Sequence, residues 1–226
     1  MLVLSLDSSS IASAALTRNG EVLAEFATQD TRSHAEALAP AVYNLLGQAD
    51  VEPSQLKAIL VGTGPGPFTG LRAGLVSART FGFAWNLPVY GMCSLDALAH
   101  RAAQGATEGT EFLVATDARR KELYWGRYEV HEDGHGRFAR SEDGPQVTAP
   151  EDLPKLPVYG HGAGLYSDHL PHAVADSTDW QPTAADLSRA AWALQERGTD
   201  LSADTTPLYL RESDAKVPVQ RKKALR

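Results

Sequence analysis

The pattern of apolar and polar positions predicts three strands at the start of the chain. The ranges are Leu2–Asp7, Ala12–Arg18 and Glu21–Thr28. Asn19-Gly20 joins the second range to the third, and this dipeptide is a strong signal for a type I′ hairpin because both central residues of that turn need a positive φ. The first 28 residues are therefore predicted to form a β-meander.

A helix is predicted to follow the meander. Ser33 and Glu36 have the spacing of a capping box, in which each side chain accepts a hydrogen bond from the other residue's backbone N–H. Leu38 and Val42 then recur at helical spacing, and the pattern ends at about Gly47.

A glycine-rich stretch, Gly62–Gly74, follows a buried strand at Ala58–Val61 and runs into a helix at Thr69–Trp85. Strand, loop and helix in this order is a layout in which backbone N–H groups can face an anion. The loop is not a Walker A motif, because Leu71-Arg72 stands where that motif needs Lys-Ser/Thr. Its glycine spacing also excludes the dinucleotide-binding fingerprint.

Small residues recur every fourth position in that helix, at Gly70, Gly74, Ala78 and Gly82. They share one helical face. Glycine inside a helix costs about 0.5–1 kcal/mol relative to alanine, so a close approach of another backbone is expected here. Two interpretations remain open: the face packs against the protein's own sheet, or it contacts another helix, in another chain.

The remaining pattern divides the chain into two lobes, residues 1–104 and 105–226, at the polar stretch Gln104–Thr110. The elements expected around and after this boundary are strands at Leu87–Gly91, Glu111–Thr116, Lys121–Val130 and Val158–Gly160, and helices at Leu95–Ala103 and Thr183–Gly198. The first lobe is therefore an α+β or mixed α/β arrangement.

Composition is that of an ordinary soluble globular protein, with 43% hydrophobic and 22% charged residues among 226. A net charge of −7 argues against a body that grips nucleic acid by itself. Residues 211–226, however, carry six basic and two acidic side chains, a net charge of +4, which leaves −11 for the rest. Cys93 is the single cysteine, and we expect a cytoplasmic protein without a membrane span.

Six motifs together resemble the TsaB (YeaZ) family. In chain order they are Asp7-Ser8-Ser9, Ser33-His34-Ala35-Glu36, Gly64–Arg72, Ser94–Leu98, Asp117–Tyr124 and Pro207–Arg211. They span nearly the whole chain, and the run from Gly64 into Phe68-Thr-Gly-Leu-Arg72 is the most specific of them. One departure is Pro67, where the family often has serine.

The resemblance implies a two-lobed α/β fold of the actin-like (ASKHA, ribonuclease H-like) type, with mixed sheets flanked by helices. It also implies a non-catalytic subunit of the bacterial complex that adds threonylcarbamoyl to the tRNA adenosine next to the anticodon. The implied partners are the TsaD transferase, the TsaE ATPase and, through the complex, tRNA. The isolated chain is expected to need no cofactor, with ATP or ADP acting only in the complex. TsaD carries two metal-binding histidines four residues apart on a helix, whereas here His34 is followed at that distance by Leu38.

Two sets of site residues are predicted, and neither includes a catalytic residue or a metal ligand. A subunit interface on the two helices of the first lobe, which would also serve a homodimer, is expected at His34, Glu36, Leu38, Gly70, Leu71, Arg72, Gly74, Leu75, Ala78 and Gly82. Loops of an actin-like nucleotide cleft are expected at Asp7, Ser8, Gly64 and Gly66.

The alternative function is a free-standing nucleotide-binding or nucleotide-hydrolysing enzyme of the actin-like fold. The missing histidine pair and the lack of a phosphate motif in the second lobe favour the subunit role. The segment Asp117–Lys121 is open between a contact with a partner or RNA phosphate and a charged sheet edge that prevents aggregation.

Overall fold

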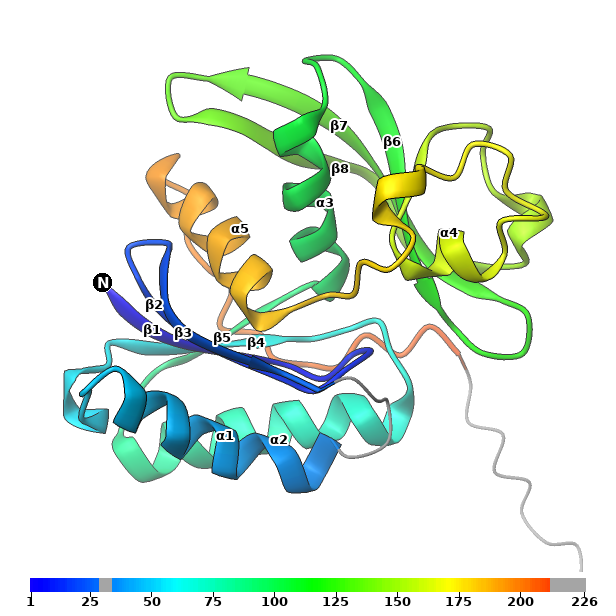
Figure 1. Ribbon diagram of the computed structural model, residues 1–226. Helices are drawn as coiled ribbons and strands as arrows, with labels where there is room; N and C mark the ends of the chain where they lie inside the picture. The colour runs from blue at the N-terminus through cyan, green and yellow to red at the C-terminus, as the bar shows by residue number, and fades with distance from the viewer. Residues whose placement is uncertain (29–33, 212–226) are drawn as a thin grey trace, which may run out of the picture.

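A computed structural model of the protein describes residues 1–28 and 34–211, apart from the side chains of residues 34 and 35. Two mixed β-sheets lie one above the other, with helices between them and below the first sheet (Figure 1). The capping box expected at Ser33 and the tail after Arg211 lie outside the described residues.

The first sheet has five strands in the order β3-β2-β1-β4-β5. Their bounds are β1 Leu2–Asp7, β2 Ser13–Arg18, β3 Glu21–Ala27, β4 Ala58–Gly62 and β5 Val89–Met92. The first three strands are antiparallel, as the sequence predicts, and Asn19 and Gly20 both have positive φ in the turn. Strands β4 and β5 extend the sheet in parallel from β1, so the glycine-rich loop leaves the carboxyl end of β4.

Two helices cover one face of this sheet: α1, His34–Gln48, and α2, Phe68–Trp85 (Figure 1). Their inward side chains join those of the strands in the largest apolar core of the described chain, whose fully buried members include Leu4, Leu6, Leu16, Leu38, Ile59 and Leu71. Full burial of such a side chain contributes about 1.5–3 kcal/mol. This core therefore fixes the two helices side by side.

The second sheet has the order β8-β7-β6-β9. Its strands are β6 Glu111–Asp117, β7 Leu123–Asp133, β8 Gly136–Thr148 and β9 Val158–Tyr159, and the short helix α4, His161–Leu165, follows. The sequence did not predict β8, because its side chains are mostly polar and at least partly exposed along an edge of the sheet. Edge strands of this kind carry little apolar periodicity.

Two helices lie between the sheets: α3, Ser94–Gly105, and α5, Ala184–Glu196 (Figure 1). Leu187, Ala190 and Ala191 of α5 pack with Val3 and Leu60 of the first sheet. After α5 the chain stays with the first lobe: Gly91 N–H donates to the Ser202 carbonyl at 2.8 Å, and Leu208 N–H donates to the Thr63 carbonyl at 2.8 Å. We call residues 202–211 the strap.

The division at residue 104 stays a prediction, to which the structure adds that α5 and the strap return to the first sheet. Within the described ranges, no helix combines the length and the apolar character needed to cross a bilayer.

Candidate functional site

Asp7 ends β1 and is fully buried where the glycine-rich loop meets α3. One carboxylate oxygen accepts hydrogen bonds from the Ser9 backbone N–H at 2.8 Å and the Ser9 hydroxyl at 2.7 Å. The other oxygen accepts from the Ser94 hydroxyl at 2.6 Å. Burial raises the pKa of this carboxyl, and the three hydrogen bonds oppose that shift.

Hydrogen bonds also tie Ser8 to α2 and the glycine-rich loop to α3. The Ser8 hydroxyl donates to the Gly70 carbonyl at 2.8 Å and accepts from the Gly74 N–H at 2.9 Å. Gly64 N–H donates to the Ser94 hydroxyl at 3.1 Å. A Cβ on Gly66 would lie only 2.4 Å from the Ser9 carbonyl oxygen, so the two loops meet backbone to backbone.

The expectation that Asp7, Ser8, Gly64 and Gly66 face a nucleotide stays a prediction. All four residues are buried, and their neighbours are each other, Ser9, Ser94 and α2. The glycines are needed here for close packing within the chain, a role that the spacing alone could not distinguish from a phosphate-binding loop.

The small-residue face of α2 packs inside the chain. A Cβ on Gly74 would lie 2.4 Å from the Ser8 hydroxyl oxygen, and one on Gly82 would lie 2.3 Å from a methyl carbon of Val89. The full set of predicted interface residues that are buried inside the chain is Leu38, Gly70, Leu71, Gly74, Leu75, Ala78 and Gly82. The first interpretation holds: this face packs against the protein's own sheet, and it offers no surface to another chain.

Large apolar side chains are nevertheless exposed on α1 and α2. Tyr43 is 61% exposed, Val76 60% and Phe83 92%. Tyr43 of α1 packs edge-on against the rings of Phe81 and Trp85 of α2. We call Tyr43, Val76 and Phe83 the outer helix patch. The sequence did not predict this patch, because helical spacing shows which residues share a face but does not show which face packs against the rest of the protein.

Three predicted interface residues remain: His34, Glu36 and Arg72. Glu36 is exposed on α1, and the side chain of His34 is outside the described residues. Arg72 is exposed too, but its guanidinium stacks over the Phe68 ring at 3.6 Å and donates to the Tyr209 hydroxyl at 2.9 Å. The role of these three residues in a subunit interface stays a prediction.

A separate cavity of about 240 Å³ lies between α3, α5 and the β7–β8 pair. Its walls are mostly apolar, and Asp96, His100, Tyr128, Arg140 and Ser141 are its polar members. The Tyr128 hydroxyl donates to Asp96 at 2.8 Å. Burial raises the pKa of Asp96 to about 6 and lowers that of His100, so both side chains favour their neutral forms more than usual.

We predict that Asp96→Asn stabilises the protein above pH 6. The raised pKa means that the folded protein holds this proton more tightly than the unfolded chain, whose aspartates titrate near pH 4. The free energy of unfolding therefore falls as the pH rises from about 4 to about 6, by about 1–3 kcal/mol, and does not fall further above that range. Asparagine retains an oxygen that can accept from Tyr128 and removes this loss.

The measurement is the melting temperature of both proteins between pH 4 and pH 8. The variant should melt higher by about 2–4 °C per kcal/mol at pH 8, with the difference vanishing towards pH 4. Asp200→Asn, at an exposed aspartate after α5, is the matched control. It should melt at the same temperature as the unaltered protein at every pH. A difference that grows towards low pH would contradict the prediction.

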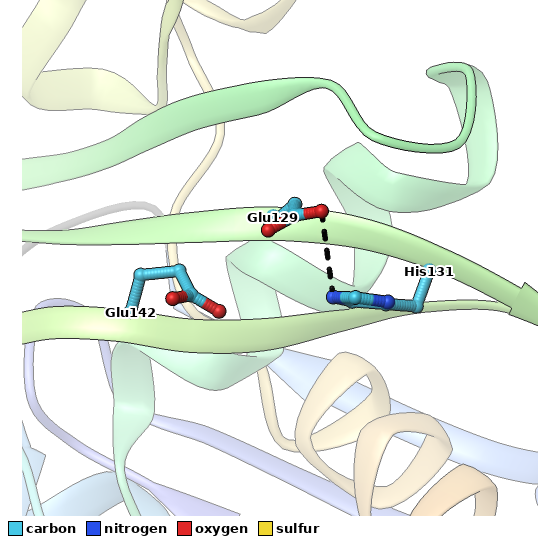
Figure 2. A group of neighbouring side chains, drawn as sticks. All are labelled: Glu129, His131 and Glu142. Carbon is cyan, nitrogen blue, oxygen red and sulfur yellow. Dashed lines mark ion pairs between the residues drawn. The ribbon is translucent and has the colours of Figure 1, made fainter.

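Glu129 and His131 of β7 and Glu142 of β8 form a cluster of possible metal ligands on the second sheet (Figure 2). Their ligand atoms lie within 4.8 Å of one another, and His131 Nε2 is 3.7 Å from a Glu129 oxygen. Arg140 already bridges the two carboxylates, at 2.7 Å from Glu142 and 3.7 Å from Glu129. This cluster is therefore an ion-pair network, and a metal would have to displace a guanidinium from it.

Comparisons with known proteins bear on the whole chain. A family model described as TsaD, tRNA N6-adenosine threonylcarbamoyltransferase, matches residues 21–216. An uncharacterised protein of Mycobacterium tuberculosis is 45% identical over 201 residues, which cover 86% of this chain and 83% of that protein. The tRNA threonylcarbamoyladenosine biosynthesis protein TsaB of Escherichia coli is 28% identical over 232 residues, covering 95% and 96% of the two chains.

Solved structures agree with the sequence comparisons. YeaZ from Pseudomonas aeruginosa superimposes with a TM-score of 0.75 and 31% identity, over 92% of this chain and all of that one. The predicted fold class, two lobes with mixed sheets flanked by helices, is thereby confirmed.

Proposed function

This chain belongs to the TsaB (YeaZ) family, and on that premise we propose that it is a non-catalytic subunit of the complex that makes threonylcarbamoyladenosine in tRNA. The observation that carries the proposal is the likeness to TsaB along almost the entire length of both chains. A TsaD-type transferase is the main partner that we propose, and a TsaE-type ATPase and tRNA join through the complex. The compartment that fits this work is the cytoplasm.

Two features of the chain support a role without catalysis. Leu38 stands where TsaD-type proteins have a second metal-binding histidine, and it is fully buried in the apolar core. The loops that would face a nucleotide in an actin-like enzyme are packed against each other. We therefore infer that ATP or ADP acts only in the complex and that the chain alone turns over no ATP.

The outer helix patch is the surface that we assign to the TsaD-type partner. Protein interfaces combine an apolar centre with a polar rim, and the exposed Glu36 lies on α1, one of the same two helices. Exposed apolar side chains gathered on one surface commonly mark contacts between proteins. In the absence of that partner, the same patch can bring two copies of this chain together about a two-fold axis.

Reconstitution tests the proposal as a whole. The full chain and the purified TsaD-type protein of the same organism should form a complex on size-exclusion chromatography. Threonylcarbamoyladenosine should form on tRNA only when both are present together with the other components of the pathway. Formation at the same rate without this chain, or transfer by this chain alone, would overturn it.

Phe83→Asp is predicted to weaken binding of the TsaD-type partner by about 30-fold, the equivalent of about 2 kcal/mol for a buried aromatic anchor. Folding should be unchanged because Phe83 is 92% exposed in the isolated chain. Calorimetric titration measures the affinity, and thermal melting checks the fold. Leu165→Asp, which alters an exposed apolar residue on α4, is the matched control and should bind like the unaltered chain. Equal affinities for the two variants would place the interface elsewhere.

A further inference from the structure

The turn between β6 and β7 has an uncommon backbone. Arg119, Arg120 and Lys121 have φ of 62°, 55° and 63°, three successive residues in the left-handed region without a glycine or asparagine among them. Side chains with a Cβ pay roughly 1–2 kcal/mol per residue in this conformation. Strain of this kind points to a use for the side chains themselves. All three are cationic, and all three are exposed.

Hydrogen bonds hold the turn in this form. Ala118 N–H donates to the Glu122 carbonyl at 3.0 Å, and Glu122 N–H donates to the Arg119 carbonyl at 3.0 Å. Asp117 accepts from the Arg119 backbone N–H at 2.7 Å and pairs with the Arg119 guanidinium at 3.0 Å. These contacts hold the backbone of the turn in one conformation, with its three basic residues exposed.

The strap brings further basic groups to this turn. Arg211, the last residue described, donates to the Ala118 carbonyl at 2.8 Å and pairs with Glu122 at 2.7 Å. At the other end of the strap, Arg79 of α2 donates to the Thr205 carbonyl at 2.7 Å. Residues 205–211 span no more than about 22 Å when fully extended. Basic side chains of both lobes therefore lie along one short segment.

Arg72 lies along the same segment, beside the rings of two aromatic residues. Its guanidinium is 3.6 Å from the centroid of the Phe68 ring and 5.9 Å from that of the Tyr209 ring. The two rings are themselves in contact, with centroids 4.9 Å apart. We call the six basic residues on these elements the basic track: Arg72, Arg79, Arg119, Arg120, Lys121 and Arg211.

The charge of the basic track contrasts with the rest of the protein. Three acidic residues, Asp117, Glu122 and Asp204, accompany its six basic ones. These six basic and three acidic residues together carry a net charge of +3, in a protein whose total is −7. Positive charge is therefore concentrated at one place on an acidic molecule.

We propose that the basic track binds the phosphate backbone of tRNA. This inference rests on the proposed function and names the surface of this chain that contacts the nucleic acid. Guanidinium groups bind phosphate oxygens through two parallel hydrogen bonds, and clustered basic residues beside exposed aromatic rings are typical of RNA-binding surfaces. The contact is with phosphates, so it positions the tRNA and does not read its sequence.

The double variant Arg120→Gln/Lys121→Gln tests the proposal. Fluorescently labelled tRNA is titrated with the full chain alone and with its complex with the TsaD-type partner, between 50 and 300 mM salt. Each lost phosphate contact should make the slope of log affinity against log salt shallower by about 0.7–1, so the double variant should differ by about 1.5–2. Arg18→Gln/Lys57→Gln is the control with the same change of charge. These two exposed residues lie at the opposite end of the first sheet, beside Leu2.

The outcomes separate this inference from the proposed function. Failure to bind the TsaD-type partner, measured without tRNA, would count against the proposed function alone. An unchanged salt slope in the turn variant overturns the inference, and so does the absence of tRNA binding by both the unaltered chain and its complex. A turn variant that loses the partner but keeps its salt slope would assign the track to an acidic protein surface, which also overturns it. A shallower slope with the partner still bound supports it.

Discussion

Gly74→Leu is expected to lower the free energy of unfolding by about 5 kcal/mol. A Cβ at this position would already lie 2.4 Å from the Ser8 hydroxyl oxygen, and leucine adds three more carbon atoms. Overpacking costs about 1–3 kcal/mol. Displacement of Ser8 would also leave buried polar groups without their hydrogen bonds, at about 1–3 kcal/mol for each group. The total is on the order of 5 kcal/mol, a large part of the 5–15 kcal/mol that stabilises an ordinary domain.

Circular dichroism and thermal melting measure this loss. Thr80→Leu introduces the same side chain at an exposed position of the same helix, and it should melt within about 0.5 kcal/mol of the unaltered protein. A Gly74→Leu protein that kept its stability and had merely lost its partner would restore the interpretation of the small-residue face as a subunit interface. A large loss of stability agrees with the packing of α2 on Ser8.

Asp7→Ala is expected to lower the free energy of unfolding by about 2–4 kcal/mol at pH 7. It removes the acceptor of three buried hydrogen bonds, two from Ser9 and one from Ser94, and each orphaned donor costs about 1–3 kcal/mol. Relief of the burial that raises the pKa of this carboxyl offsets part of the cost. The loss should be smaller for Asp7→Asn, which keeps an acceptor for Ser9 and carries no charge.

Urea unfolding of the three proteins measures these differences, with Asp168→Ala at an exposed aspartate as the control. Equal stability of Asp7→Ala and the unaltered chain would mean that the carboxylate does not hold the loops together. A role in nucleotide binding would then have to be reconsidered for Asp7.

The strands and helices of the first lobe could be predicted from the sequence because local signals there agree with tertiary packing. Asn19-Gly20 requires the hairpin that the structure contains, and Ala58–Val61 is apolar enough to be a buried strand in any arrangement. Strand β8 could not be predicted, since its pairing with β7 depends on backbone hydrogen bonds more than on apolar side chains. The lobe boundary was predicted from the polar stretch Gln104–Thr110, and recognition of the family supplied the actin-like type of the fold.

The candidate site was harder to predict, because spacing shows which residues share a face but not what that face meets. Gly74 was correctly identified as a point of close approach, yet the atoms that approach it come from Ser8, 66 positions earlier. The basic track depends on contacts across similar separations, such as that between Arg211 and Ala118. From the sequence, charge was the only signal for the segment Asp117–Lys121 and for Arg211. The fold shows that they lie together.

Packing of α5 on the first sheet has a consequence for the order in which the protein folds during its synthesis. The five strands of that sheet are complete once Met92 has been made, but the helix that covers their second face begins at Ala184 and ends at Glu196. At about 5–20 residues per second, the ribosome needs roughly 5–20 s to add the residues in between. Throughout that time Val3 and Leu60 lack the α5 side chains that bury them. The first lobe therefore reaches its final state only when nearly the whole chain has been translated, and the two lobes mature together.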